Sequence, residues 1–211
     1  REGVMDQFDI DVTREEVERE AVLGWRQKGV DVDGRPIWDW LIDPHAAIAF
    51  ISIREFREDV IGRFRSAFRE ASDTLGPDRS VAGLILDLRD DPGGLRWVAE
   101  DLLDLFVSNG TIFSAEGRRG KVRSHSASSF STRLEGLPIV VLVNSSSASA
   151  SEIVAGTLQA VGGAVVVGER THGKGSVQTV RTLFNNGYAF VTESWFTVPD
   201  GRGGRRLIDR Y

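Results

Sequence analysis

The 211-residue chain contains no cysteine, only three histidines and no long apolar run. Without cysteine there is no disulfide bond, thiolate nucleophile or cysteine-based zinc site, although this absence does not identify a cellular compartment. The longest apolar segments fall far short of the roughly 20 residues that cross a bilayer. The sequence therefore offers no membrane-spanning helix.

The chain also lacks an excess of basic residues. Its 26 Lys and Arg stand against 31 Asp and Glu, which gives a net charge of −5. Basic residues are interleaved with acidic ones, so we expect no surface for nucleic acid. The sequence begins at Arg1 with neither an initiator Met nor a leader, and we expect it to be a fragment of a longer protein.

Beyond residue 45, short apolar runs alternate with amphipathic helical patterns. The pattern predicts strands over 48–53, 81–88, 138–143 and 164–167, helices over 56–71, 95–106 and from about 150, and a hairpin over 177–184 and 188–198. This alternation predicts an α/β fold of βαβ units with a mostly parallel sheet. Residues 1–45 lack a helical period, so we assign 1–45 to a small strand and linker layer and 46–211 to the core. The serine-rich stretch 124–131 predicts a flexible surface loop.

Three loops follow buried strands, at the sheet edge where open α/β folds bind ligands. The first reads LRDDPGGL over 88–95. Its paired Gly93 and Gly94 allow the backbone to approach a ligand and to point amide N–H groups at it, although a tight strand-to-helix turn explains them equally well. Asp90 and Asp91 could form a metal pair, but a helix-capping role for Asp91 or simple exposure to solvent is the favoured interpretation.

The second loop reads NSSSASASE over 144–152, between a predicted strand and a predicted helix. Serine is favoured as a helix cap, and Glu152 adds favourable charge in the first turn. A nucleophilic serine here would also gain the helix-start amides, which stabilise an oxyanion on an attacked carbonyl. Both interpretations remain open from the residues alone.

The third loop reads GERTHGKGSVQT over 168–179. It lacks the Ser or Thr that a phosphate-binding loop carries after its lysine, because residue 175 is Gly, and a strand rather than a helix follows. Lys174 lies between Gly173 and Gly175, a pattern that indicates a bend in the backbone that directs the lysine side chain. A lysine serves as the base for a serine nucleophile when burial lowers its pKa from about 10.4. His172 is the alternative base.

Together, the three loops resemble the carboxyl-terminal processing proteases, also called tail-specific proteases. The patterns LILDLRxNPGG, VLVN, SASASE and GERTxGKGxVQ of that family occur here in the same order, within about 48–201. The resemblance implies that Ser149 is the nucleophile, Lys174 the general base and Gln178 the residue that orients the lysine. It also implies oxyanion amides at Ala150 and, in preference to Gly93, at Gly94.

The same resemblance implies a ClpP/crotonase-like core and a serine endopeptidase that cleaves proteins near their C-termini through an acyl-enzyme. It implies no cofactor and no metal, protein or peptide substrates bound through unstructured C-termini, and a periplasmic or cell-envelope location. Oligomeric state stays open. Members of the family carry an upstream PDZ domain, of which residues 9–20 resemble only the end.

One departure and two alternatives accompany this resemblance. Asp90 and Asp91 stand where the family usually has asparagine at one position, which adds negative charge near the oxyanion loop. A peptide- or lipid-binding module of the same fold, as in interphotoreceptor retinoid-binding protein, would not need the Ser-Lys pair. A crotonase-like acyl-CoA enzyme would not need Lys174.

Overall fold

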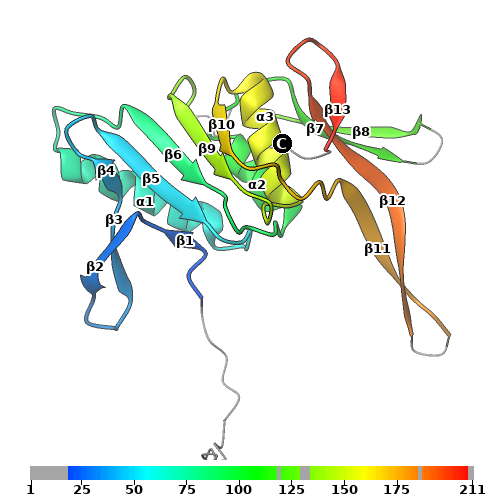
Figure 1. Ribbon diagram of the computed structural model, residues 1–211, viewed down its shortest axis with the longest axis horizontal. Coiled ribbons are helices and arrows are strands. Elements are labelled where there is room, and N and C mark those ends of the chain that lie inside the picture. The colour runs from blue at the N-terminus through cyan, green and yellow to red at the C-terminus, as the bar shows by residue number, and fades with distance from the viewer. Residues whose placement is uncertain (1–18, 118–119, 129–133, 185–186, 209–211) are drawn as a thin grey trace, which may run out of the picture.

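The computed structural model describes residues 19–117, 120–128, 134–184 and 187–208. Its main sheet has six strands, of which four are parallel and lie side by side in the order β5 (Ile48–Ile53), β6 (Gly83–Asp87), β9 (Ile139–Val143) and β10 (Val165–Gly168). Strands β1 (Val22–Leu23) and β4 (Leu41–Asp43) pair with β5 in the antiparallel sense. The α/β class with a largely parallel sheet is confirmed (Figure 1).

Three helices follow strands of this sheet: α1 (Val60–Leu75), α2 (Arg96–Leu103) and α3 (Ala150–Val161). Helix α2 contacts both α1 and α3. Their buried side chains recur at three- and four-residue spacing, as in Val60, Phe64, Ala67 and Ala71 of α1, and join the core of the sheet. This packing fixes where each helix begins, and therefore where the loop before it turns.

A second sheet is antiparallel, and the sequence predicted only two of its strands, β11 (Ser176–Thr182) and β12 (Tyr188–Pro199). Strand β12 also pairs with β7 (Thr111–Gly117) and β13 (Arg205–Leu207), and β7 pairs with β8 (Val122–Ser126). Strand β8 corrects the predicted loop over 124–131 for its first three residues; residues 129–131 lie outside the described part. The Ser124 hydroxyl lies 3.0 Å from that of Ser114 on β7, which helps to hold this serine-rich strand in the sheet.

Strands also occur before residue 46. A hairpin of β2 (Arg26–Val30) and β3 (Pro36–Asp39) lies between β1 and β4 along the chain (Figure 1). Because β1 and β4 belong to the main sheet, strands from both sides of the predicted boundary at 45/46 share it. The division into domains stays a prediction, and residues 9–18 of the predicted PDZ remnant lie outside the described part.

The fold brings the three loops of interest to one edge. Strands β6, β9 and β10 are neighbours and parallel, so their carboxyl ends meet, and the loops at 88–95, 144–149 and 169–175 leave from that edge. Helix α3 joins this edge to the second sheet, since the Thr157 hydroxyl donates to the Ile112 carbonyl oxygen. Within the described ranges, no helix is long and apolar enough to cross a membrane.

Candidate active site

One cleft collects all five site residues that the sequence predicts. Gly94, Ser149, Ala150, Lys174 and Gln178 line a space of about 350 Å³ between the two sheets. The remaining lining is largely apolar and comes from α3, β11 and β12: Ile153, Val177, Val180, Phe190 and Phe196, with Arg96 and Ser176. The structure thus brings the predicted residues together, while their roles remain to be tested.

Ser149 lies at a sharp turn between β9 and α3. Its backbone has φ 57° and ψ −111°, a conformation that non-glycine residues rarely adopt. Such a turn between a strand and a helix projects the nucleophile above the sheet in enzymes of the α/β-hydrolase fold. Ala148 and Ala150 beside it are buried, so this part of the loop is held against the core.

The Gly93–Gly94 turn packs directly against Ser149. A Cβ atom at Gly93 would lie 2.9 Å from the Ser149 Cβ and 2.7 Å from the Ala148 carbonyl oxygen, and one at Gly94 would lie 2.4 Å from the Phe56 carbonyl oxygen. Both glycines also have positive φ, 100° and 141°. A side chain at Gly93 would displace the Ser149 loop, and one at Gly94 would displace the Phe56 backbone.

The backbone N–H groups around Ser149 differ in their availability. That of Gly93 donates to Asp91 Oδ1 at 2.8 Å. Those of Gly94 and Ala150 have no acceptor among the described residues. The two unused donors line the same cleft, as an oxyanion site requires.

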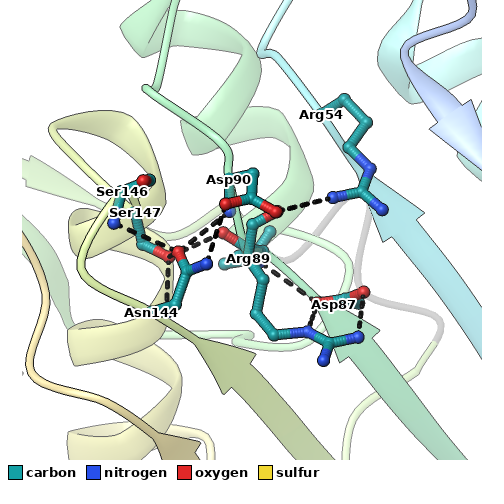
Figure 2. A network of polar contacts seen from close by, with 8 residues as sticks. Arg54, Asp87, Arg89, Asp90, Asn144, Ser146 and Ser147 are labelled. Carbon is teal, nitrogen blue, oxygen red and sulfur yellow. Dashed lines mark hydrogen bonds and ion pairs between the residues drawn. The ribbon is translucent and has the colours of Figure 1, made fainter.

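A polar network ties the first loop to the second (Figure 2). Asn144 Oδ1 accepts the N–H of Asp90 at 2.9 Å and that of Ser146 at 3.1 Å, while Asn144 Nδ2 donates to Asp90 Oδ1 at 2.8 Å. Arg54 lies 3.6 Å from the other Asp90 oxygen. Asp90 is therefore a link between loops, and the described residues contain no cluster of three potential metal ligands around it.

Asp87 and Arg89 form the deeper part of this network. The Arg89 guanidinium donates to both oxygens of the buried Asp87 carboxylate, at 2.8 and 2.9 Å, and this pairing raises the pKa of Arg89. Arg54 donates in turn to the Arg89 carbonyl oxygen at 2.8 Å. The end of β6 is thereby fixed immediately before the Gly93–Gly94 turn.

Glu152 connects the second loop to the third. Its fully buried carboxylate accepts four hydrogen bonds, three of them from backbone N–H groups: Ser149 N at 2.8 Å, Gly173 N at 2.6 Å, Lys174 N at 2.8 Å and Thr171 Oγ1 at 2.8 Å. The sequence indicated only a favourable charge at a helix start, and the Ser149-x-x-Glu152 spacing was the signal available. The structure adds that Glu152 binds the backbone of both Ser149 and Lys174.

The third loop leaves both candidate bases exposed. Lys174 is exposed, so the described residues do not desolvate its amine, and no hydrogen bond joins that amine to the Ser149 hydroxyl. His172 is also exposed; its backbone N–H donates to the Ser147 carbonyl oxygen at 3.0 Å, and its side chain is not part of the cleft lining. Of these two residues, Lys174 lines the cleft and His172 does not.

Comparison with known proteins places this arrangement in a family. The sequence matches Peptidase family S41 over residues 47–206. A carboxy-terminal-processing protease of Bartonella bacilliformis is 36% identical over 158 residues, which cover 73% of this chain and 35% of that protein. A carboxyl-terminal-processing protease of Picosynechococcus sp. is 33% identical over 177 residues, covering 83% and 37%.

A solved structure agrees with the sequence matches. The photosystem II D1 C-terminal processing protease superimposes with a TM-score of 0.71 and 29% identity, over 93% of this chain and 47% of that one. The chain spans little more than a third of the length of the two curated relatives. Since the family match covers most of its residues, the chain belongs to peptidase family S41.

Proposed function

We propose that this chain is the catalytic core of a serine endopeptidase that uses Ser149 and Lys174 and cleaves proteins near their C-termini. The observation that carries the proposal is the cleft, where a serine on a strained turn, a lysine and two unused amides lie together. The relatives are carboxyl-terminal-processing proteases, which supports the preference for C-termini.

In the proposed reaction, the neutral Lys174 amine takes the proton of the Ser149 hydroxyl as Ser149 Oγ attacks the substrate carbonyl carbon. The N–H groups of Gly94 and Ala150 stabilise the resulting oxyanion. The Lys174 ammonium then gives its proton to the leaving amine as the C–N bond breaks. Lys174 next activates a water that hydrolyses the acyl-enzyme, and Gln178 on β11 orients the lysine.

Because Lys174 is exposed, we propose that the bound substrate covers it. A peptide lying in the cleft would cover Lys174 and exclude water from it, so that substrate binding itself prepares the base. The apolar lining formed by Ile153, Val177, Val180 and Phe190 supports a preference for apolar side chains beside the scissile bond.

The proposed location is extracytoplasmic, as the resemblance to carboxyl-terminal processing proteases implies. The proposed substrates are unstructured protein tails, because the cleft is open and an extended chain enters it without unfolding a domain. We propose no cofactor for this reaction, since Ser149, Lys174 and the two amides suffice for acyl transfer.

Cleavage of casein, an unstructured protein, tests the proposal. Wild type should release fragments, whereas Ser149→Ala and Lys174→Ala should not, and His172→Ala should keep most of the rate. A His172→Ala protein as inactive as Lys174→Ala would refute the Ser-Lys assignment. Melting curves of each variant exclude misfolding as the cause, and peptide binding without cleavage by every version would favour the non-catalytic binding module.

A further inference from the structure

Asp91 is a buried carboxyl group in the loop that carries the proposed oxyanion amide. Its side chain is completely buried. Oδ1 accepts the Gly93 N–H at 2.8 Å, but Oδ2 is buried and has no hydrogen-bond partner among the described residues. A charged carboxylate loses several kcal/mol of hydration when buried, and an unpartnered oxygen recovers none of it.

The main chain of Asp91 lies at the centre of the site. Its carbonyl oxygen accepts the Ala148 N–H at 3.0 Å and the Ser151 hydroxyl at 3.0 Å, which joins the first loop to both sides of Ser149. The Asp91 carboxyl group accepts the N–H of Gly93, and Gly93 packs against the Ser149 Cβ. A charge on Asp91 would thus be close to the oxyanion that forms in the reaction.

The charged surroundings of Asp91 do not compensate for that charge. Two charged residues follow β5: Glu55 raises the pKa of Asp91 and Arg54 lowers it. The Arg54 guanidinium donates to the Arg89 carbonyl oxygen and lies nearer to Asp90. The groups that α3 and the second loop bring to Asp91 are the neutral Ser151 and Ala148.

We propose that Asp91 positions the oxyanion loop as a neutral carboxylic acid, and that turnover falls when this acid ionises. The inference rests on the proposed function of the cleft. Burial raises the pKa of Asp91 to about 7; the Gly93 N–H, the Ser151 hydroxyl and Arg54 oppose this rise, and Glu55 adds to it. Relative to a variant that cannot ionise at this position, wild-type turnover should therefore fall as the pH rises above that pKa.

The Asp91→Asn variant isolates this effect. Its amide oxygen still accepts the Gly93 N–H, while its NH₂ group takes the place of the acid O–H and cannot ionise. We expect the wild-type rate, divided by that of Asp91→Asn at the same pH, to fall above the pKa of Asp91. Asp91→Asn should be about tenfold faster than wild type at pH 8 and similar at pH 6, because the neutral fraction of Asp91 falls about tenfold for each pH unit above its pKa of about 7.

The matched control is Asp90→Asn, the same substitution one residue earlier on an exposed carboxylate. Whatever its effect on the rate, its rate divided by that of Asp91→Asn should show the same fall at alkaline pH. A second readout needs no turnover: the melting temperature of Asp91→Asn, measured in the Ser149→Ala background, should rise relative to Ser149→Ala alone from pH 5 to pH 7 and then stay level. The folded state holds the Asp91 proton more tightly than the unfolded state, so wild-type stability declines over that window.

Superimposable pH profiles of wild type and Asp91→Asn, in turnover and in melting temperature, would overturn this inference alone. Turnover by neither protein at any pH would overturn the proposed function and this inference with it. A melting difference that does not change with pH would show that Asp91 is not the titrating group, and would also overturn the inference. A fall at alkaline pH, relative to Asp91→Asn, that wild type and Asp90→Asn share is the result that we expect.

Discussion

Along the cleft, the wall that carries Ser149 is buried and cross-bonded, whereas the wall that carries Lys174 and Gln178 is exposed. Ala148, Ala150, Ser151 and Glu152 have at most a few per cent of their surface in solvent. Lys174 and Gln178 are exposed, and β11 and β12 run on from them as a long ribbon that leaves the body of the molecule (Figure 1). Phe190 on this ribbon is 69% exposed.

This difference separates the groups that must be fixed before substrate arrives from those that substrate can complete. A nucleophile and its oxyanion amides gain from rigid placement, because no reorganisation is then needed during reaction. The wall that carries Lys174 is exposed. It is held in place by the backbone N–H groups of Gly173 and Lys174, which donate to the Glu152 carboxylate. In the proposed function, the bound substrate covers this exposed wall.

The largest expected effect comes from the reacting groups, one on each wall. Ser149→Ala and Lys174→Ala should each lower turnover of casein by about a thousandfold or more, because neither step of acyl transfer proceeds without them. Free energies of unfolding in urea should change by less than about 1 kcal/mol, since Lys174 is exposed and Ser149→Ala removes one oxygen. A residual rate above a few per cent in either variant would contradict their roles.

The next effect comes from the group that joins the two walls. Glu152→Ala leaves four donors without their acceptor, and we expect it to reduce the free energy of unfolding by about 3 kcal/mol, as urea denaturation would measure. Turnover should fall as well, because both Ser149 and Lys174 lose a backbone anchor. Glu152→Gln keeps one acceptor oxygen and should lie between wild type and Glu152→Ala; equal stability of all three would argue against the link.

A smaller effect is expected on the exposed wall. Phe190→Ala removes an apolar side chain that lines the cleft, so KM for peptides with apolar residues should rise by about three- to tenfold while kcat changes little. Stability should stay within about 0.5 kcal/mol of wild type because Phe190 is mostly exposed. Steady-state kinetics on two peptides, one apolar and one polar beside the scissile bond, would check this; equal changes in KM for both would contradict it.

The smallest effect tests a single contact of Glu152. Thr171→Val keeps the shape of a buried side chain but removes its hydroxyl donor at 2.8 Å. We expect a loss of about 1 kcal/mol in the free energy of unfolding, with turnover reduced less than twofold, because three backbone donors still hold the carboxylate. A loss as large as that of Glu152→Ala would mean that the backbone donors contribute little.

The contrast between the walls also explains what the sequence predicted. Strands β5, β6 and β9 are continuous, largely apolar runs with no exposed residue, so their positions were confirmed to within two residues. Strand β8 has four exposed residues out of five and no apolar alternation, which is why a loop was predicted there. Its place in the sheet depends on pairing with β7, which a local pattern does not contain.

The site shows the same division between local and distant information. The motifs predicted five residues, and the structure gathers all five in one cleft, although their roles stay predictions. The sequence did not predict that Glu152 would bind the third loop or that Asp91 would be buried, because both depend on partners from distant segments. The mechanism inferred from the sequence also required a buried lysine, whereas Lys174 is exposed.

The Glu152 carboxylate has a consequence for the order in which the chain folds. Three of its four donors lie 19 to 22 residues further along the chain, at 171, 173 and 174. Before those residues have been synthesised and brought to the sheet edge, this carboxylate cannot be buried without a large loss of hydration. The start of α3, and with it the Ser149 turn, is therefore fixed only once the lysine loop has docked, so a partly made chain does not yet hold the serine in its final geometry.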